Sequence, residues 1–93
     1  MAQYTIRIEL HDATWDEYET MYQYLAAQGI TDIIISKEGI RYKMPPAEYN
    51  YEGNATRSQV LDMAKASAAK VVRSYAVLVT ESAGRTWYGL DKA

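Results

Sequence analysis

Two helix-start signals divide this chain, and they constrain its fold more than any other feature. Thr14 to Glu17 (TWDE) and Thr56 to Gln59 (TRSQ) each place a threonine three residues before Glu or Gln. In such a capping box the threonine side chain accepts a hydrogen bond from the third helical amide, and the Glu or Gln side chain bonds back. Apolar residues at three- and four-residue steps follow both boxes. They predict one helix that ends at Gly29 and a second that runs to about Arg73.

The segments outside these helices carry strand patterns. Tyr4 to Leu10 alternates apolar and polar residues, as a strand with one buried face does. Lys37 to Gly39 predicts a hairpin turn. Pro45-Pro46 cannot donate ladder hydrogen bonds, so we expect residues 40–44 to form an edge strand or a loop. The strands that we expect are residues 4–10, 30–36, 47–52 and 75–80.

The resulting order of elements is β-α-β-β-α-β. This order predicts an α+β fold, a ferredoxin-like sandwich in which two helices cover one face of a four-stranded antiparallel sheet. We expect residues 1–93 to form a single domain of this kind, with a short C-terminal tail after the last strand.

The other face of the predicted sheet is open, and the strand phases indicate which residues it carries. They are Thr5, Arg7, Glu9, Glu48, Asn50, Glu52, Ala76, Leu78 and Thr80. The strand tyrosines have the opposite phase, which disfavours the base-stacking sheet of RNA-recognition modules. A mixed polar and aliphatic face suits a second protein layer better, either a symmetric dimer or the chain's own tail.

The composition excludes several classes of function. The chain has no cysteine, which excludes disulfides, thiolate metal sites and a cysteine nucleophile. A net charge of −2 does not indicate a general polyanion binder, and we expect no DNA specificity. Neither a secretory leader nor an apolar run of membrane-spanning length is present, so we expect a cytoplasmic protein without a membrane partner.

His11 and Asp12, directly after the first strand, are the candidate catalytic residues. An imidazole at a strand end can act as general acid or base, and Asp12 can orient it. The alternative is a structural role in a capping loop. No cofactor motif is present, and the acidic residues near the first helix start serve the helix dipole equally well. We therefore predict no cofactor and no metal-site residues, and the sequence leaves a divalent metal requirement open.

Two segments combine cations with aromatic rings. Arg41-Tyr42-Lys43 follows the hairpin turn, and Arg85-Thr86-Trp87-Tyr88 lies in the tail. Phosphate attraction combined with base stacking is typical of surfaces that bind single-stranded nucleic acid. We therefore predict that these residues, with Arg7 as a further cation, bind RNA. The alternative is that Trp87 covers an edge of the core and Tyr42 closes a loop.

Three stretches together carry a family resemblance: "YTIRIELHDATWDEYETMYQYLAAQGI", "RYKMPPAEYNYEG" and "YAVLVTESAGRTWYGL". They resemble the GhoS-like antitoxin family over nearly the whole chain. The resemblance implies a ferredoxin-like endoribonuclease, the antitoxin of a type V toxin–antitoxin system, which cleaves the messenger RNA of its toxin. It also implies a likeness in fold to small CRISPR-associated nucleases, which commonly dimerise. No set of catalytic residues comes with it.

Two hypotheses of function follow. The first is an antitoxin-type endoribonuclease that cleaves single-stranded mRNA. The second is a non-catalytic protein-interaction module, a homodimer that associates through the open sheet face.

Overall fold

Both helices begin at their predicted capping boxes in the structure, a computed structural model that describes residues 1–93. Helix α1 spans Trp15–Ala27 and helix α2 spans Arg57–Ala69. The hydroxyls of Thr14 and Thr56 each accept from the third helical amide, and the third side chain bonds back in both cases. Helix α2 ends before the predicted Arg73, because its last turn tightens into a bond from the Val71 amide to the Ala68 carbonyl.

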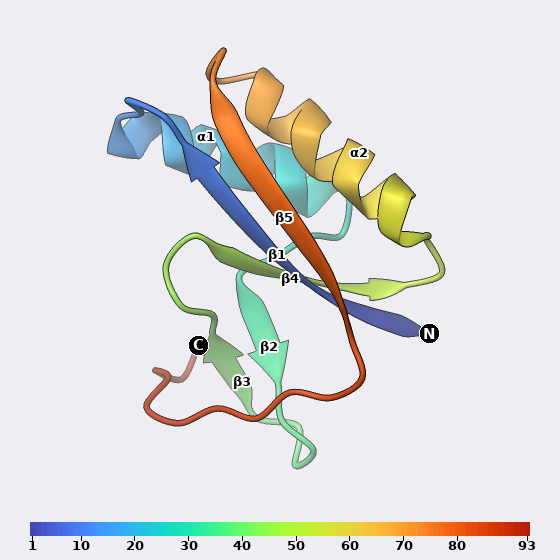
Figure 1. Ribbon diagram of the computed structural model, residues 1–93. Helices are drawn as coiled ribbons and strands as arrows, with labels where there is room; N and C mark the ends of the chain where they lie inside the picture. The colour runs from blue at the N-terminus through green and yellow to red at the C-terminus, as the bar shows by residue number, and fades with distance from the viewer.

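The main sheet has three antiparallel strands in the order β4-β1-β5. Strand β1 (Ala2–Leu10) is central and pairs with β4 (Glu48–Gly53) on one side and with β5 (Tyr75–Ser82) on the other. Figure 1 shows both helices behind this sheet, so one face is covered and the other faces the viewer. The α+β class and the helix layer agree with the prediction from the sequence.

The expected fourth strand is not part of this sheet. Within the expected strand, Thr31 makes a single bridge to Asn50 of β4. Strand β2 (Ile33–Ile35) instead pairs with β3 (Arg41–Lys43) in a separate two-stranded sheet. Residues 40–44, expected as an edge strand or a loop, thus contain the return strand of a hairpin. The predicted layout of four strands is replaced by three strands and a hairpin, which lies below the main sheet in Figure 1.

Hydrogen bonds explain why the pairing with β4 stops after one bridge. In a continued ladder the Ile33 carbonyl would accept from the Glu48 amide. The Ile33 carbonyl instead accepts from the Asn50 side-chain amide at 3.1 Å. The Glu48 amide instead donates to the Pro45 carbonyl at 3.1 Å. The Ile33 carbonyl and the Glu48 amide are therefore both bonded elsewhere, and the ladder does not continue. Just before β4, Ala47 turns the chain with a φ of 66°.

The core lies between the helices and the covered face of the sheet. Inward residues of β1 meet apolar residues of both helices, and all are buried: Tyr4, Ile6, Ile8, Leu10, Met21, Leu25, Val60, Ala64 and Ala68. Tyr4 and Tyr49 face this core, as their strand phases predicted. Neither helix has the length and apolar character that crossing a bilayer requires.

The C-terminal tail, residues 83–93, crosses from β5 to the hairpin. Its end pairs with β3: the Lys43 amide donates to the Asp91 carbonyl at 2.8 Å, and the Ala93 amide donates to the Arg41 carbonyl at 2.9 Å. Figure 1 shows this red segment running from the end of β5 to β3. We call β2, β3 and the tail together the hairpin–tail layer. It covers the lower part of the sheet's open face, as the tail alternative predicted, and leaves Leu78 uncovered.

Candidate nucleic-acid interface

The structure brings the two predicted cation-and-aromatic segments together. The rings of Tyr42 and Trp87 lie 5.6 Å apart between centroids, at an angle of 66°. The bridge between Tyr42 and Lys92 fixes this arrangement. Trp87 is half-buried and Tyr88 is fully exposed. The tail therefore serves partly as a lid, as the structural alternative proposed, and partly as an aromatic surface.

A groove of about 350 Å³ lies at this junction. Its wall combines the open sheet face with the hairpin–tail layer: Thr5, Ile34, Met44, Pro45, Glu48, Arg85, Thr86, Trp87, Tyr88 and Leu90. This volume falls within the range of sites that take small organic groups. Its lining offers ring faces, a carboxylate and a hydroxyl, which are the groups that contact a nucleobase.

Arg85 anchors the tail to the sheet. Its guanidinium donates to the Thr5 hydroxyl at 3.2 Å and to the Tyr4 carbonyl at 3.4 Å, and it lies 3.9 Å from a Glu52 oxygen. Only 15% of the side chain is exposed. Burial lowers the pKa of Arg85, and the Glu52 carboxylate acts in the opposite direction. Two hydrogen bonds from one guanidinium nitrogen of this predicted RNA ligand are therefore used within the fold, and its Nε atom is buried without a partner.

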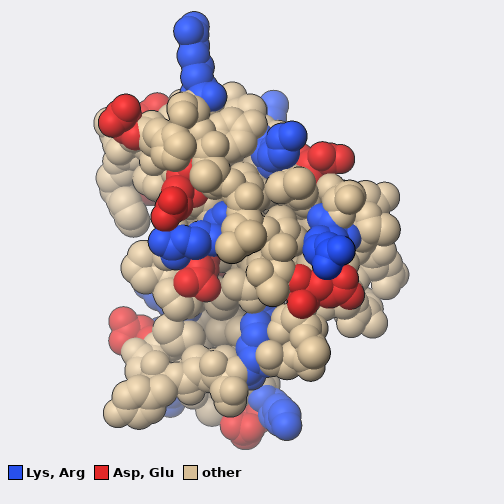
Figure 2. Space-filling view, in the orientation of Figure 1, with Lys and Arg blue, Asp and Glu red and all other residues tan.

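Of the other predicted RNA-binding cations, one forms ion pairs within the fold and two do not. Arg7 lies on the open face, as expected, with Glu9 at 3.0 Å and Glu48 at 3.6 Å. Arg41 and Lys43 are exposed and have no acidic partner within salt-bridge distance. Figure 2 shows cationic and acidic side chains interspersed on the viewed face, without a broad patch of one sign.

Arg41 and Lys43 point to the side of the hairpin opposite to Tyr42, because successive strand residues alternate. Their cross-strand partners are Ile35 and Ile33, so the outer side of the hairpin combines two cations with aliphatic side chains. Lys92 lies opposite Tyr42 and shares its side. The Tyr42–Trp87 pair thus has Lys92 on its own side of the hairpin, and Arg41 and Lys43 on the opposite side.

His11 and Asp12 lie at the far end of β1. The His11 Nδ1 atom lies 2.7 Å from the Ser74 hydroxyl, and the His11 amide donates to the Ser74 carbonyl at 3.0 Å. Asp12 turns the chain toward α1 with a φ of 55° and makes no hydrogen bond to the imidazole. The predicted orientation of His11 by Asp12 is therefore not formed, and Ser74 is the neighbour that holds the ring.

The two ends of β1 are too far apart to form one compact site. Thr5, which contacts Arg85, is six positions from His11, or about 20 Å along an extended strand. No group of three or more His, Asp or Glu side chains gathers where a metal ion could be held. The candidate residues thus form an interface near the tail and a separate histidine site.

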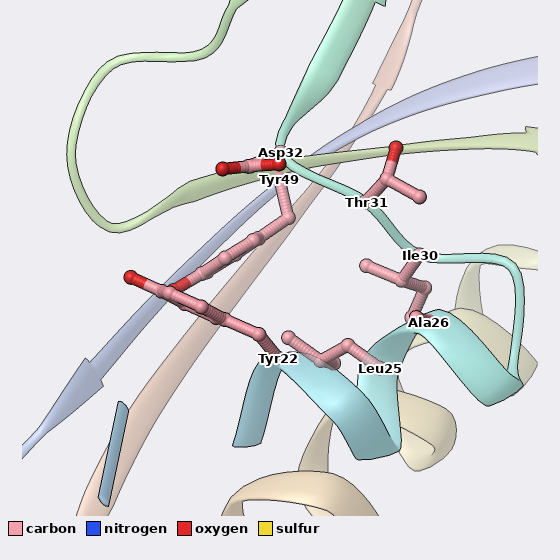
Figure 3. Close-up of a pocket in the computed structure, with 7 residues that line it drawn as sticks. All are labelled: Tyr22, Leu25, Ala26, Ile30, Thr31, Asp32 and Tyr49. Carbon is pink, nitrogen blue, oxygen red and sulfur yellow. The ribbon is translucent and has the colours of Figure 1, made fainter. Parts of the chain in front are cut away.

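A second cavity lies on the helix side, beside the place where β2 leaves the sheet. It has a volume of about 190 Å³, and Figure 3 shows its lining: Tyr22, Leu25, Ala26, Ile30, Thr31, Asp32 and Tyr49. The Tyr49 hydroxyl is buried without a hydrogen-bond partner. Burial raises the pKa of Tyr49 strongly, and the nearby Tyr22 hydroxyl adds to this rise. No sequence pattern indicates this cavity, which is smaller than common ligand sites.

The fold and its site define a small α+β domain with an aromatic groove at a tail-covered sheet face and a histidine at the opposite strand end. Comparison with models of known protein families finds none that matches this chain, and comparison with curated proteins finds no significant relative.

Proposed function

We propose that this protein binds single-stranded RNA at the hairpin–tail layer and cleaves it as an antitoxin-type endoribonuclease. The observation that carries the binding proposal is the contact between Tyr42 and Trp87, whose ring centroids lie 5.6 Å apart although the residues are distant in sequence. This contact joins two segments that each supply cations and rings. The order of helices and strands also fits a ferredoxin-like ancestry in which the second strand has moved into the hairpin.

In the proposed complex, one base enters the groove beside Trp87, and a neighbouring base stacks on Tyr88. The exposed ring of Tyr88 suits this role because it has no packing contact to lose. Stacking on an aromatic side chain contributes about 1–3 kcal/mol per base. Arg41, Lys43 and Lys92 attract the phosphates on either side.

Cleavage requires a group that takes the proton from a 2′-hydroxyl, and His11 is the only histidine. Its exposed imidazole accepts this proton as the 2′-oxygen attacks the adjacent phosphorus in line. The bond from phosphorus to the 5′-oxygen breaks, and the leaving oxygen takes a proton from water. To reach His11, a strand held at the groove has to extend about 20 Å to the far end of β1. The products are a 2′,3′-cyclic phosphate and a 5′-hydroxyl end.

Binding is tested with a labelled single-stranded RNA rich in U and A, titrated at several salt concentrations. Each phosphate contact adds about 0.7 to the steepness of the log–log salt dependence for single strands, so Arg41→Ala/Lys43→Ala should reduce the slope by roughly 1.4. Arg57→Ala/Lys65→Ala, which removes equal charge from helix α2, is the matched control. Equal slopes for both double variants would contradict the proposed interface.

The stacking role is tested with Tyr88→Ala, which we expect to weaken binding about tenfold. Trp15→Ala is the control, since Trp15 is exposed on the helix side. If the two variants bind equally well, the RNA does not stack on Tyr88.

Cleavage is tested separately by end-labelled RNA and analysis of the product termini. His11→Ala should bind RNA as the parent does and produce no cyclic phosphate. Ser74→Ala, which removes the bond that holds the imidazole, should slow cleavage and leave binding unchanged. RNA that is bound but never cut, with or without magnesium, would reject the catalytic half of the proposal and leave the binding half standing.

A further inference from the structure

Strand β5 has one unpaired edge. It pairs with β1 only, and no other segment bridges to it. The His11 amide donates to the Ser74 carbonyl, and in an antiparallel ladder such bonded pairs alternate with non-bonded pairs. Along the register of β1 and β5, this alternation directs the backbone groups of Val77 and Val79 away from β1. These groups form a ready template for another strand.

The central part of this edge, before Glu81, lacks the features that usually prevent strand addition. Residues 75–80 contain no proline, no glycine and no charge, and Leu78 is 64% exposed. Natural edges are commonly protected by charges, bulges, prolines or a covering segment. The opposite edge of the sheet is protected in this way, because β4 carries Glu48 and Glu52 and is bridged by Thr31 at Asn50. The contrast leaves the β5 edge as the one open to strand addition.

We propose that this partner is a second copy of the chain, whose β5 pairs antiparallel with β5 about a two-fold axis at Val77. In this register Val77 lies opposite Val77 of the second copy, and Leu78 lies opposite Ala76. Tyr75 lies opposite Val79, an aromatic and β-branched pair of the kind that stabilises sheets. On the open face, the large Leu78 side chain therefore lies opposite the small Ala76 side chain. The two three-stranded sheets join into one sheet of six strands.

Charge complementarity supports this partner over an unrelated peptide. The same register places Glu81 opposite Arg73 of the second copy, and the two-fold axis repeats the pair at the other end. Both side chains are exposed, and neither has an ion-pair partner within the monomer. The edge is thus complementary to itself in backbone bonding, in side-chain size and in charge. The proposal needs no RNA and is independent of the proposed function.

Sedimentation of the full chain without RNA tests the proposal. We expect the parent to dimerise at tens of micromolar, and Glu81→Arg to weaken the dimer roughly tenfold, because it sets two pairs of like charges opposite each other. Arg73→Glu should weaken it similarly, and the double variant Glu81→Arg/Arg73→Glu should restore it. Glu19→Arg on helix α1 is the charge-matched control and should leave association unchanged.

Amide hydrogen exchange at low and high protein concentration gives the second measurement. The Val77 and Val79 amides should become protected as the dimer forms, whereas the amides of the exposed tail residues Gly84 and Tyr88 should not change. If the parent protein stays monomeric at about 100 µM, the proposal is overturned. A dimer that forms without protection of Val77 and Val79, or that ignores both charge reversals, overturns it equally.

Discussion

The two faces of the central sheet are covered by layers of different physical character. On the helix side, Ile6, Ile8 and Met21 have no exposed surface and pack among apolar neighbours. On the open side, the hairpin–tail layer is held by Arg85, by the half-buried ring of Trp87 and by backbone pairing at β3. Apolar burial stabilises in proportion to area, whereas a few polar bonds contribute modestly and in discrete steps. We therefore expect the layer that carries the candidate site to detach more easily than the helix layer.

Truncation in the helix-side core should have the largest effect. Ile8→Ala removes fully buried methyl groups beneath both helices and should lower the free energy of unfolding by about 2–5 kcal/mol. Urea denaturation followed by circular dichroism measures the loss, and Ile35→Ala, at a 54% exposed hairpin position, is the control. If both substitutions lower the free energy of unfolding equally, the helix-side core is not packed more strongly than the hairpin–tail layer.

Loss of the Arg85 anchor should have the next largest effect, and it should be local. Arg85→Ala removes the bonds to Thr5 and Tyr4 and leaves Glu52 without its cation, at a cost of about 1–3 kcal/mol. The tail should open while the helical signal stays. A Trp15→Phe background leaves Trp87 as the sole reporter, whose fluorescence should shift to the red.

The control for the anchor is Arg73→Ala, which removes an exposed arginine without a partner in the monomer. It should leave the fluorescence of Trp87 unchanged at concentrations below those of self-association. If Arg85→Ala instead unfolds helices and tail together, the hairpin–tail layer is part of one cooperative core.

The difference between the faces also explains which features the sequence could reveal. The helix starts followed from Thr14 and Thr56 because a capping box acts within a few residues. The inward phase of Tyr4 and Ile6 followed from strand alternation. Both signals are local, and they define the helix-side layer.

The hairpin–tail layer depends on contacts between distant segments, and local patterns do not encode those. The side chain of Asn50 diverts the Ile33 carbonyl, and no residue pattern indicates that a side-chain amide will replace a ladder bond. The sequence suggested that Arg41-Tyr42-Lys43 and the tail had similar composition, but their contact depends on the path of the whole chain. The sequence also did not indicate that Arg85 would bond to the sheet at Thr5, or that the Ser74 hydroxyl would contact the His11 ring.

Tyr49 offers a test of the helix-side layer through pH. Burial raises the pKa of its hydroxyl above the ordinary value near 10, so the native state keeps this proton where the unfolded phenol loses it. Stability is therefore fully present below pH 10 and falls as the pH rises further. By pH 11 the loss from this one group should be about 1.4 kcal/mol.

Tyr49→Phe is the matching variant, since it removes the unpaired hydroxyl and keeps the ring. The variant should equal or exceed the parent in stability at pH 7, and the advantage should grow between pH 10 and 11. Unfolding by urea at each pH measures the difference. Tyr88→Phe, at a fully exposed position, should show no such growth. Parallel pH curves for parent and Tyr49→Phe would mean that solvent reaches Tyr49.

The contact between Tyr42 and Trp87 should give the smallest effect and the most specific one. Edge-to-face aromatic pairs contribute about 0.5–1.5 kcal/mol beyond their buried area. A double-mutant cycle with Tyr42→Leu and Trp87→Leu isolates this coupling from the separate loss of each ring. Urea denaturation of the four proteins measures it, and a parallel cycle with Tyr42 and Tyr88 should give no coupling. A coupling of zero for Tyr42 and Trp87 would mean that the two rings do not pack against each other in solution, and Trp87 beside the groove would then lack the support of the hairpin.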